Sequence, residues 1–145
     1  MNRRFTVRLA AWGEDEKAIH RIREVVFVQE QSVDPEIEWD GLDDACLQAL
    51  AEDENRDGIG TGRLHPSGKI GRMAVMHSWR GQGVGAAIME CLIDAARQAG
   101  LDDVYLHAQT RVVGFYARFG FEPEGEEFEE ADIPHRLMRR RLAND

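Results

Sequence analysis

The residues best suited to chemistry lie in a glycine-rich segment near the middle of the chain. It follows an apolar run ending at Val75, precedes a helical pattern, and consists of Arg80, Gly81, Gln82, Gly83, Val84, Gly85 and Ala86. Backbone N–H groups at the start of a helix form an anion site together with the helix dipole. Glycine has no Cβ, so a phosphate can approach closely, and Arg80 adds a positive charge. The segment predicts a site for a phosphate-bearing ligand.

Two other phosphate motifs compete for this interpretation. The nucleotide-triphosphate loop requires G-x-x-x-x-G-K-[ST], and no Lys-Ser or Lys-Thr follows these glycines. The dinucleotide fingerprint fits Gly81, Gly83 and Ala86, with Asp102 or Asp103 about 20 residues further on. However, an antiparallel meander precedes the segment and only about 60 residues follow it, too few for a doubly wound sheet. A nicotinamide-dependent oxidoreductase therefore stays as the weaker alternative.

The patterns around the segment predict the elements that hold it. Period-two alternation indicates strands at 5–10, 45–52, 59–65, 70–76 and 104–106, and helical spacing indicates helices at 15–26, 84–99 and 112–119. From Phe121 onward we expect two closing strands around a Glu-rich turn at 124–130. Residues 27–44 are predicted to form an irregular loop because Pro35 and Gly41 break a helix. That loop carries seven acidic residues and no basic one.

Composition narrows the class of partner. The net charge of −9 argues against nucleic acid and against an anionic membrane surface, and it is compatible with a cationic amine. No apolar run is long enough for a membrane helix, and no apolar signal region follows the N-terminal arginines. Cys46 and Cys91 lack metal-ligand or disulfide spacing. We therefore expect a cytoplasmic protein with no metal, no nucleic acid and no membrane among its partners.

Two motifs together resemble the GNAT superfamily of N-acetyltransferases. Residues 80–85 match its [QR]-x-x-G-x-[GA] acyl-CoA motif, and residues 114–121 resemble its second motif, which follows about 30 residues later. The segments 27–31 and 38–43, as well as Ala108-Gln109 and residues 133–135, resemble its ElaA-like subgroup. The chain departs from many members at two positions, with His77 in place of proline and Gln109 in place of asparagine.

The resemblance implies the fold. It predicts one N-acetyltransferase domain over residues 1–145, of the α/β (α+β) class, with a mixed but mostly antiparallel central sheet of about six or seven strands. About four helices would flank this sheet. The fourth and fifth strands would splay apart, leaving a gap for the pantetheine arm of the cofactor.

Acetyl-CoA is the cosubstrate that the resemblance implies. The pantetheine arm would hydrogen-bond to the backbone of Met73, Ala74 and Val75. The pyrophosphate would lie on the N–H groups of residues 82–86. Arg80 and Gly81 complete this cofactor site, and Phe115 would pack against the arm. Gln109, which stands where many members have asparagine, would also contact the cofactor.

Transfer of an acetyl group to an amine requires a deprotonated amine, donors for the oxyanion and a proton for the thiolate. Tyr116 matches the family's general-acid tyrosine, although its alternative is a core aromatic residue. Glu30 and His135 are the candidate bases, with His107 as a further histidine beside the pantetheine. Deprotonation through water would need none of them.

The acceptor is less defined by the sequence. The acidic residues of the 27–44 loop would attract a cationic amine, or they form a solvated face. Trp39 is a candidate wall of the acceptor pocket, and Trp79 would line the phosphate loop or pack beside it. We expect a small-molecule or protein amine as substrate, and the family's frequent dimers permit a homodimer. A non-catalytic acyl-CoA sensor is the alternative of another class.

Overall fold

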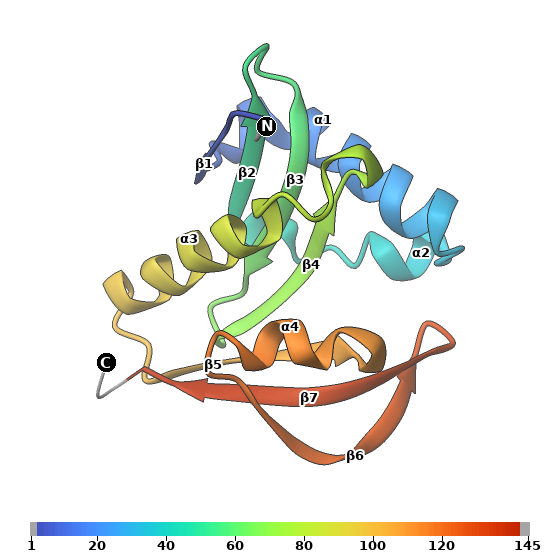
Figure 1. The fold of residues 1–145 in the computed structure, drawn as a ribbon, viewed down its shortest axis with the longest axis vertical. Coiled ribbons are helices and arrows are strands. Elements are labelled where there is room, and N and C mark those ends of the chain that lie inside the picture. Colours follow the sequence, from blue (N-terminus) through green and yellow to red (C-terminus); the bar gives the residue numbers. More distant parts are fainter. Residues whose placement is uncertain (1–2, 143–145) are drawn as a thin grey trace.

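The computed structural model describes residues 3–142, with the side chains at positions 36 and 37 left undescribed. Seven strands form one sheet in the order β1-β2-β3-β4-β5-β7-β6 (Figure 1). The strands are β1 (Phe5–Leu9), β2 (Leu47–Asp53), β3 (Gly58–Leu64), β4 (Lys69–Val75), β5 (Asp103–Gln109), β6 (Glu122–Glu130) and β7 (Ile133–Arg141). Every neighbouring pair is antiparallel except β4 and β5, which confirms the predicted mixed sheet.

Helices cover both faces of this sheet. They are α1 (Trp12–Arg23), the π-helical turn Glu24–Glu30 that continues it, α2 (Pro35–Glu38), α3 (Val84–Gln98) and α4 (Val113–Ala117). The helices α3 and α4 lie on one face, and α1 and α2 lie on the other (Figure 1). Ile88, Leu92 and Val104 belong to the larger core under α3, whereas Ile19 and Ile22 belong to the smaller core under α1. None of the described helices is both long and apolar enough to cross a membrane.

Two glycines of β3 set the close approach of α3 to the sheet. A Cβ at Gly60 would lie 2.9 Å from the side chain of Ile88, and a Cβ at Gly62 would lie 3.0 Å from the side chains of Ile88 and Leu92. These distances are tighter than ordinary Cβ contacts, so the helix rests directly on the backbone of β3. This packing fixes where the N-terminus of α3 meets the end of β4.

Two predicted segments are wrong in detail. Residues 27–44 are not wholly irregular, because the helix that begins at Trp12 continues as π-helix to Glu30 and the short helix α2 follows. The predicted Glu-rich turn at 124–130 is part of strand β6, and the chain reverses instead at Ala131 and Asp132, which have φ angles of 51° and 63°. Glutamate is disfavoured in buried strands, but β6 is an exposed edge strand where it stays in water.

Candidate active site

The centre of the molecule is a split between β4 and β5. These parallel strands pair only at Lys69 with Tyr105 and at Ile70 with Leu106. Beyond Ile70 they diverge, as Figure 1 shows, while β5 remains paired with β7 along its whole length. The edge of β4 over residues 71–75 therefore has no strand partner on the β5 side. This is the splay that the resemblance predicted for the fourth and fifth strands.

A bulge in β4 accompanies the divergence. Thr61 and Arg63 of β3, two residues apart, pair with Ala74 and Gly71 of β4, three residues apart. The bulge contains Arg72, whose φ of 51° is a left-handed conformation. A bulge of this kind bends its strand and increases the local twist. It therefore turns β4 away from β5 immediately after their last pair.

The glycine segment forms the connection from β4 to α3. Gly81 and Gly83 have φ angles of 76° and 88°, which an L side chain adopts only with strain, and a Cβ at either would meet no atom within 4 Å. Gly83 is the N-cap of α3 and provides no side-chain cap. The first N–H groups of the helix, from Val84 onward, consequently lack intrahelical acceptors. Those of Val84, Gly85 and Ala86 belong to the 82–86 set on which the resemblance would place the pyrophosphate.

Three of the predicted cofactor residues converge beside the split. A Cβ at Gly85 would lie 3.4 Å from the ring of Phe115 and 3.8 Å from the side chain of Val75. Phe115 thus reaches from α4 across to the first turn of α3. Val75 has its carbonyl oxygen occupied, because Arg80 donates to it through Nε at 2.9 Å. The described structure therefore brings the two sequence motifs together at one place.

Tyr116 lies on α4 next to Phe115. Its ring makes an edge contact with Phe115 at 5.1 Å and packs near Phe121 at 6.3 Å. Among the described residues no hydrogen bond is formed by its hydroxyl group. Burial raises the pKa of Tyr116 to about 12, so the phenol carries its proton throughout the physiological range.

Glu30 is held by the glycine segment. Its two carboxylate oxygens accept from Arg80 at 3.1 and 2.8 Å. This ion pair joins the end of the π-helical turn to the loop after β4. Arg80 is therefore shared between a structural contact and any bound phosphate, and the carboxylate of Glu30 is already engaged.

Gln109 lies on the other arm of the split. Its amide nitrogen donates to the side-chain oxygen of Gln31 at 2.9 Å, and its own oxygen accepts from Arg111. Glu30 and Gln31 are neighbours in the chain. Glu30 binds Arg80, which follows β4, and Gln31 binds Gln109, at the end of β5, so these two residues connect both sides of the split. Sequence reasoning missed the contact with Gln31, because the two positions are 78 residues apart in the chain.

The two histidines of the C-terminal strands share one carboxylate. His107 Nδ1 lies 2.9 Å from Glu130, and His135 Nε2 lies 3.7 Å from its other oxygen. Burial opposes ionisation of Glu130, but the hydrogen bond with His107 and the nearby charges of His107, Lys69 and His135 together outweigh it and lower the pKa of the carboxyl. His135 Nδ1 lies 2.6 Å from the carbonyl of Ile133, which makes Nδ1 the donor and leaves the lone pair on Nε2.

The acidic loop does not present a plain acidic face. Three of its carboxylates alternate with three arginines from α1, β3 and β4 in a closed ring. Neighbours in this ring are ion-paired at 2.5–3.2 Å, and its members in order are Arg23, Glu38, Arg72, Asp40, Arg63 and Asp43. We call this set the ion-pair ring. The prediction that these acids recruit a cationic amine is corrected, because arginines distant in sequence already neutralise them.

The ion-pair ring is largely removed from water. The side chain of Arg23 is fully buried and that of Glu38 is 3% exposed. Burial raises the pKa of Glu38. Burial also opposes ionisation of Asp40, but hydrogen bonds from Arg63 and the Leu42 backbone outweigh it and lower the pKa of Asp40 to about 2. The set carries three positive and three negative charges, so it contributes no net charge to its surroundings.

Neither tryptophan that the sequence singled out stands free at the site. Trp39 packs on α1, with His20 at 4.5 Å and the Arg23 guanidinium at 4.7 Å from its ring. Trp79 is 5% exposed and packs under Phe5, with Arg3 stacked on it at 3.6 Å. Both contribute to packing in the described structure.

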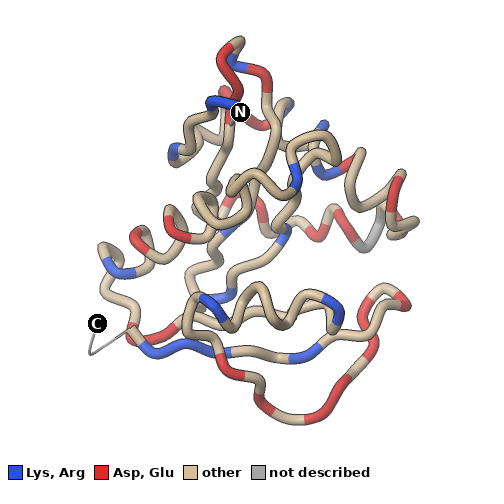
Figure 2. Tube along the Cα trace, in the orientation of Figure 1, with Lys and Arg blue, Asp and Glu red and all other residues tan. Residues whose placement is uncertain are grey.

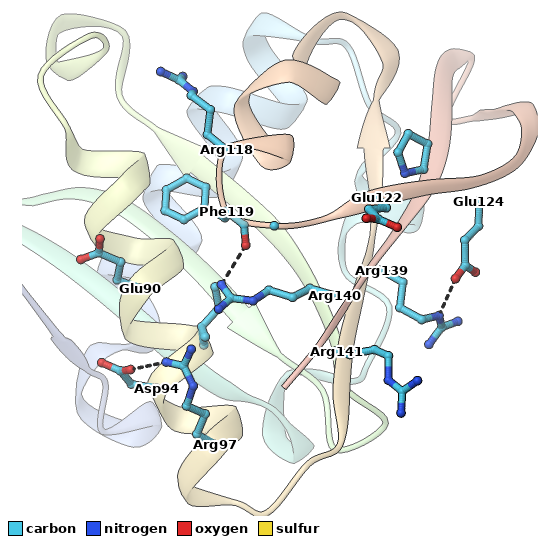
Figure 3. A pocket seen from close by; sticks show the side chains of 13 residues that line it. Glu90, Asp94, Arg97, Arg118, Phe119, Glu122, Glu124, Arg139, Arg140 and Arg141 are labelled. Atoms are coloured by element: carbon cyan, nitrogen blue, oxygen red, sulfur yellow. Dashed lines mark hydrogen bonds and ion pairs between the residues drawn. The ribbon is translucent and has the colours of Figure 1, made fainter. Parts of the chain in front are cut away.

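A cavity of about 950 Å³ lies between the C-terminal half of α3 and the strands β6 and β7 (Figure 3). None of the predicted site residues lines it. Three of its arginines are engaged locally: Arg97 with Asp94, Arg139 with Glu124, and Arg140 with the carbonyl of Phe119. A smaller cavity of about 220 Å³ lies instead at the closed end of the β4–β5 split, and its residues Lys69 and Tyr105 were not identified from the sequence. Only the pairing of β4 with β5 reveals that these two residues face each other.

No group of three His, Cys, Asp or Glu side chains suited to a metal ion occurs in the described part of the chain. What the arrangement offers is a free strand edge, a helix N-terminus without a cap and a buried phenol, all beside one split. An extended ligand with a phosphate at one end fits such a set of groups. The fold and the site define the class of acyl-CoA-dependent acyltransferases.

Comparison with known proteins gives the family. Residues 20–142 match the acetyltransferase (GNAT) domain, and the chain belongs to that family. It is 39% identical to uncharacterized N-acetyltransferase YjcF from Bacillus subtilis over 121 residues, which covers 81% of this chain and 86% of that protein. The weaker alternative from the sequence, a doubly wound dinucleotide-binding fold, is therefore wrong.

Two solved structures share the fold and a recognisable sequence. An acyl-CoA N-acyltransferase from Pseudomonas aeruginosa superposes with a TM-score of 0.81 at 33% identity, over 96% of this chain and 99% of that one. Escherichia coli ElaA superposes with a TM-score of 0.79 at 30% identity, over 94% and 99%. The resemblance to the ElaA-like subgroup is confirmed.

Proposed function

We propose that this protein transfers an acetyl group from acetyl-CoA to a primary amine, by direct attack of the amine in a ternary complex. The observation that carries the proposal is the unpaired edge of β4 over residues 71–75, which leads directly to the uncapped N-terminus of α3. Membership of the GNAT family and the names of its relatives support acyl transfer in general. The acetyl group and the amine are the specific parts of the proposal.

The cofactor would be held mainly by backbone. The pantetheine arm carries amides, which can add to the edge of β4 as a further strand would. The pyrophosphate would accept hydrogen bonds from the N–H groups that begin at Val84, where the helix dipole also favours negative charge. Phe115 would close the split over the arm. The thioester would then lie near Ile70, where β4 and β5 meet.

The reaction requires one bond to form and one to break at the thioester carbon. The neutral amine attacks the carbonyl, the C–S bond breaks, and the leaving thiolate takes a proton. Tyr116 would donate this proton, since its phenol is protonated in the folded protein and its position matches the family's general-acid tyrosine. The proton released by the amine passes to solvent, from which Tyr116 is reprotonated.

The base is the least constrained role. The engagement of Glu30 with Arg80 argues against it as the proton acceptor. His135 offers a lone pair on Nε2 but points it toward Glu130. We therefore propose that water carries the proton from the amine.

Gly83 provides the sharpest test, since Gly100 offers a matched control. Both glycines have left-handed φ angles, 88° and 76°, both have free space around a built Cβ, and they lie at opposite ends of α3. Alanine costs roughly 1–2 kcal/mol of strain at either position. Only at Gly83 would the new methyl group obstruct an approaching phosphate.

The measurement is calorimetric titration with acetyl-CoA, with NADH as a control ligand. We expect micromolar binding by the wild-type protein and by Gly100→Ala, and at least about tenfold weaker binding by Gly83→Ala. Equal weakening in both variants would refute the assignment of the phosphate to this loop. Binding of acetyl-CoA without acetylation of any amine would favour the sensor instead.

A further inference from the structure

The small cavity at the closed end of the split has a polar lining in which basic residues outnumber acidic ones. It measures about 220 Å³, and its charged lining residues are Asp40, Arg63, Lys69 and Arg72. The hydroxyl of Tyr105 reaches Ser67 at 3.2 Å along one wall. Gly71, the first residue of β4 beyond its pairing with β5, is also part of the lining. The cavity therefore opens on the place where the thioester would lie.

Most of these charges cancel within the ion-pair ring. Arg63 and Arg72 each hold two carboxylates, and Asp40 is shared between them. Lys69 does not belong to the ring, and among the described residues no carboxylate lies within ion-pair distance of its ammonium group. The charge of Lys69 contributes to the lowered pKa of Glu130, whose carboxylate is hydrogen-bonded to His107. Among the residues whose side chains are described, the cavity consequently carries one positive charge that no carboxylate neutralises by contact.

We propose that Lys69 binds an anionic group of the acceptor, so that the substrate class is an amine that also bears a carboxylate, such as an amino acid. This inference rests on the proposed acetyl transfer and deepens it. An acid on the acceptor pairs with the ammonium group of Lys69 through charge-assisted hydrogen bonds. The volume of the cavity suits a molecule of amino-acid size, and the hydroxyls of Ser67 and Tyr105 provide neutral partners.

Binding through Lys69 also avoids a cost that acidic residues would impose. A carboxylate beside an amine stabilises the protonated form and so lowers the fraction of neutral nucleophile. The acidic residues that the sequence suggested for recruitment would have this effect, whereas Lys69 would not. An acceptor held by its carboxylate at Lys69 would thus present its amine to the thioester without a dedicated base.

Three acceptors that share a primary amine on a four-carbon chain separate the alternatives. They are 4-aminobutyrate, with a carboxylate at the far end, n-butylamine, with no second charge, and 1,4-diaminobutane, with a second cation. We would measure kcat/KM for each from the release of CoA thiol at saturating acetyl-CoA. We expect 4-aminobutyrate to exceed n-butylamine by about tenfold or more, and the diamine to be the poorest.

Variants of Lys69 then assign the difference to one residue. Lys69→Met is expected to raise KM for 4-aminobutyrate about tenfold and to leave n-butylamine nearly unchanged, whereas Lys69→Arg retains the preference. Lys17→Met is the matched control, because Lys17 is the only other lysine of the chain and lies exposed on α1. A KM increase confined to 4-aminobutyrate would not arise from a loss of folding, which lowers activity toward all acceptors.

The outcomes distinguish this proposal from the one on which it rests. A ranking with the diamine first, an equal response of all acceptors to Lys69→Met, or no acetylation of any of the three while acetyl-CoA still binds would overturn the assignment of Lys69. Loss of acetyl-CoA binding by the wild-type protein, measured in parallel by calorimetry, would instead overturn the acetyltransferase proposal.

Discussion

The glycine segment and the ion-pair ring both manage charge, but they do so by different means. The glycine segment, residues 80–86, offers backbone N–H groups that come from a stretch of seven neighbours in the chain. The ion-pair ring gathers side chains from α1, the acidic loop, β3 and β4, whose partners are between 15 and 34 residues apart. The glycine segment leaves the first N–H groups of α3 without intrahelical acceptors, and the ion-pair ring satisfies nearly all of its own charges.

This difference indicates which region serves binding and which serves stability. Unsatisfied donors in accessible space are available for a ligand, and they require little of the surrounding fold. Paired charges in the interior have no spare capacity for a ligand, and removing one of them exposes its partner as an unpaired buried charge. Changes to the ring should therefore alter folding, whereas changes beside the glycine segment should alter catalysis.

The largest effect is expected from Arg23→Met. The substitution leaves Glu38 and Asp43 without the fully buried guanidinium that both contact. Breaking a buried pair from one side typically destabilises a protein by about 3–5 kcal/mol. The free energy of unfolding, measured with chemical denaturant, should fall by this amount.

Arg8→Met is the matched control for that experiment. Arg8 also contacts two carboxylates, those of Asp15 and Glu52, but its side chain is 45% exposed. An exposed pair contributes about 0–1 kcal/mol. Equal losses in the two variants would remove the distinction between the buried ring and an ordinary surface contact.

Tyr116→Phe should have the next largest effect, and on catalysis alone. A positioned acid contributes about 10² to 10⁴ in rate, so we expect kcat to fall by about 100-fold or more. The ring of residue 116 retains its packing against Phe115 and Phe121, so acetyl-CoA affinity should be preserved. Steady-state rates and calorimetry together check both parts, and an unchanged kcat would exclude Tyr116 from the mechanism.

Glu30→Gln should have a smaller effect on kcat. If Glu30 only anchors Arg80, its replacement should change kcat by less than about tenfold, which is below the range for loss of a general base. The pH profile of kcat should keep its shape. A 100-fold decrease, with loss of the basic limb of that profile, would instead identify Glu30 as the catalytic base.

The smallest effect concerns acid stability. Because the pKa of Asp40 is lowered to about 2 in the folded protein, its ionised form stabilises the fold above about pH 4, and this contribution is lost as the pH falls toward 2. The stability difference between the wild-type protein and Asp40→Asn should therefore narrow over that interval. The raised pKa of Glu38 acts in the opposite direction but is common to both proteins.

Asp44→Asn serves as the control for this measurement, because Asp44 is an exposed neighbour in the same loop. Unlike Asp40, Asp44 forms no ion pair with any of the three arginines of the ion-pair ring in the described structure. A narrowing of the same size in both variants would show that the ring does not govern the acid response.

The glycine segment shows what the sequence can predict. Its strand, turn and helix are adjacent in the chain, so the positions of Gly83 and Val84 follow from local rules for turns and helix ends. Residues 114–121 were placed beside them only through the resemblance, and the contact of Phe115 with Gly85 agrees with that placement.

The ion-pair ring shows where such inference ends. Nothing near Glu38 or Asp43 in the chain indicates that Arg23 and Arg63 will meet them, because these pairs form only when α1, the loop and β3 come together. The bulge at Arg72 is equally hidden, since a left-handed arginine has no sequence signal. The sequence predicts only a strand or turn position for Lys69, because its place beside Tyr105 depends on the pairing of β4 with β5.

The edge strand β6 has a consequence for self-association. It pairs only with β7, so its other edge is free, and Figure 2 shows acidic residues along much of it. The glutamates of this strand are Glu122, Glu124, Glu126, Glu127, Glu129 and Glu130. If a second molecule added its own β6 there, rows of like charge would face each other, which disfavours pairing. The strand thus protects the protein from growth into a continuous intermolecular sheet, and a dimer would have to form on another surface.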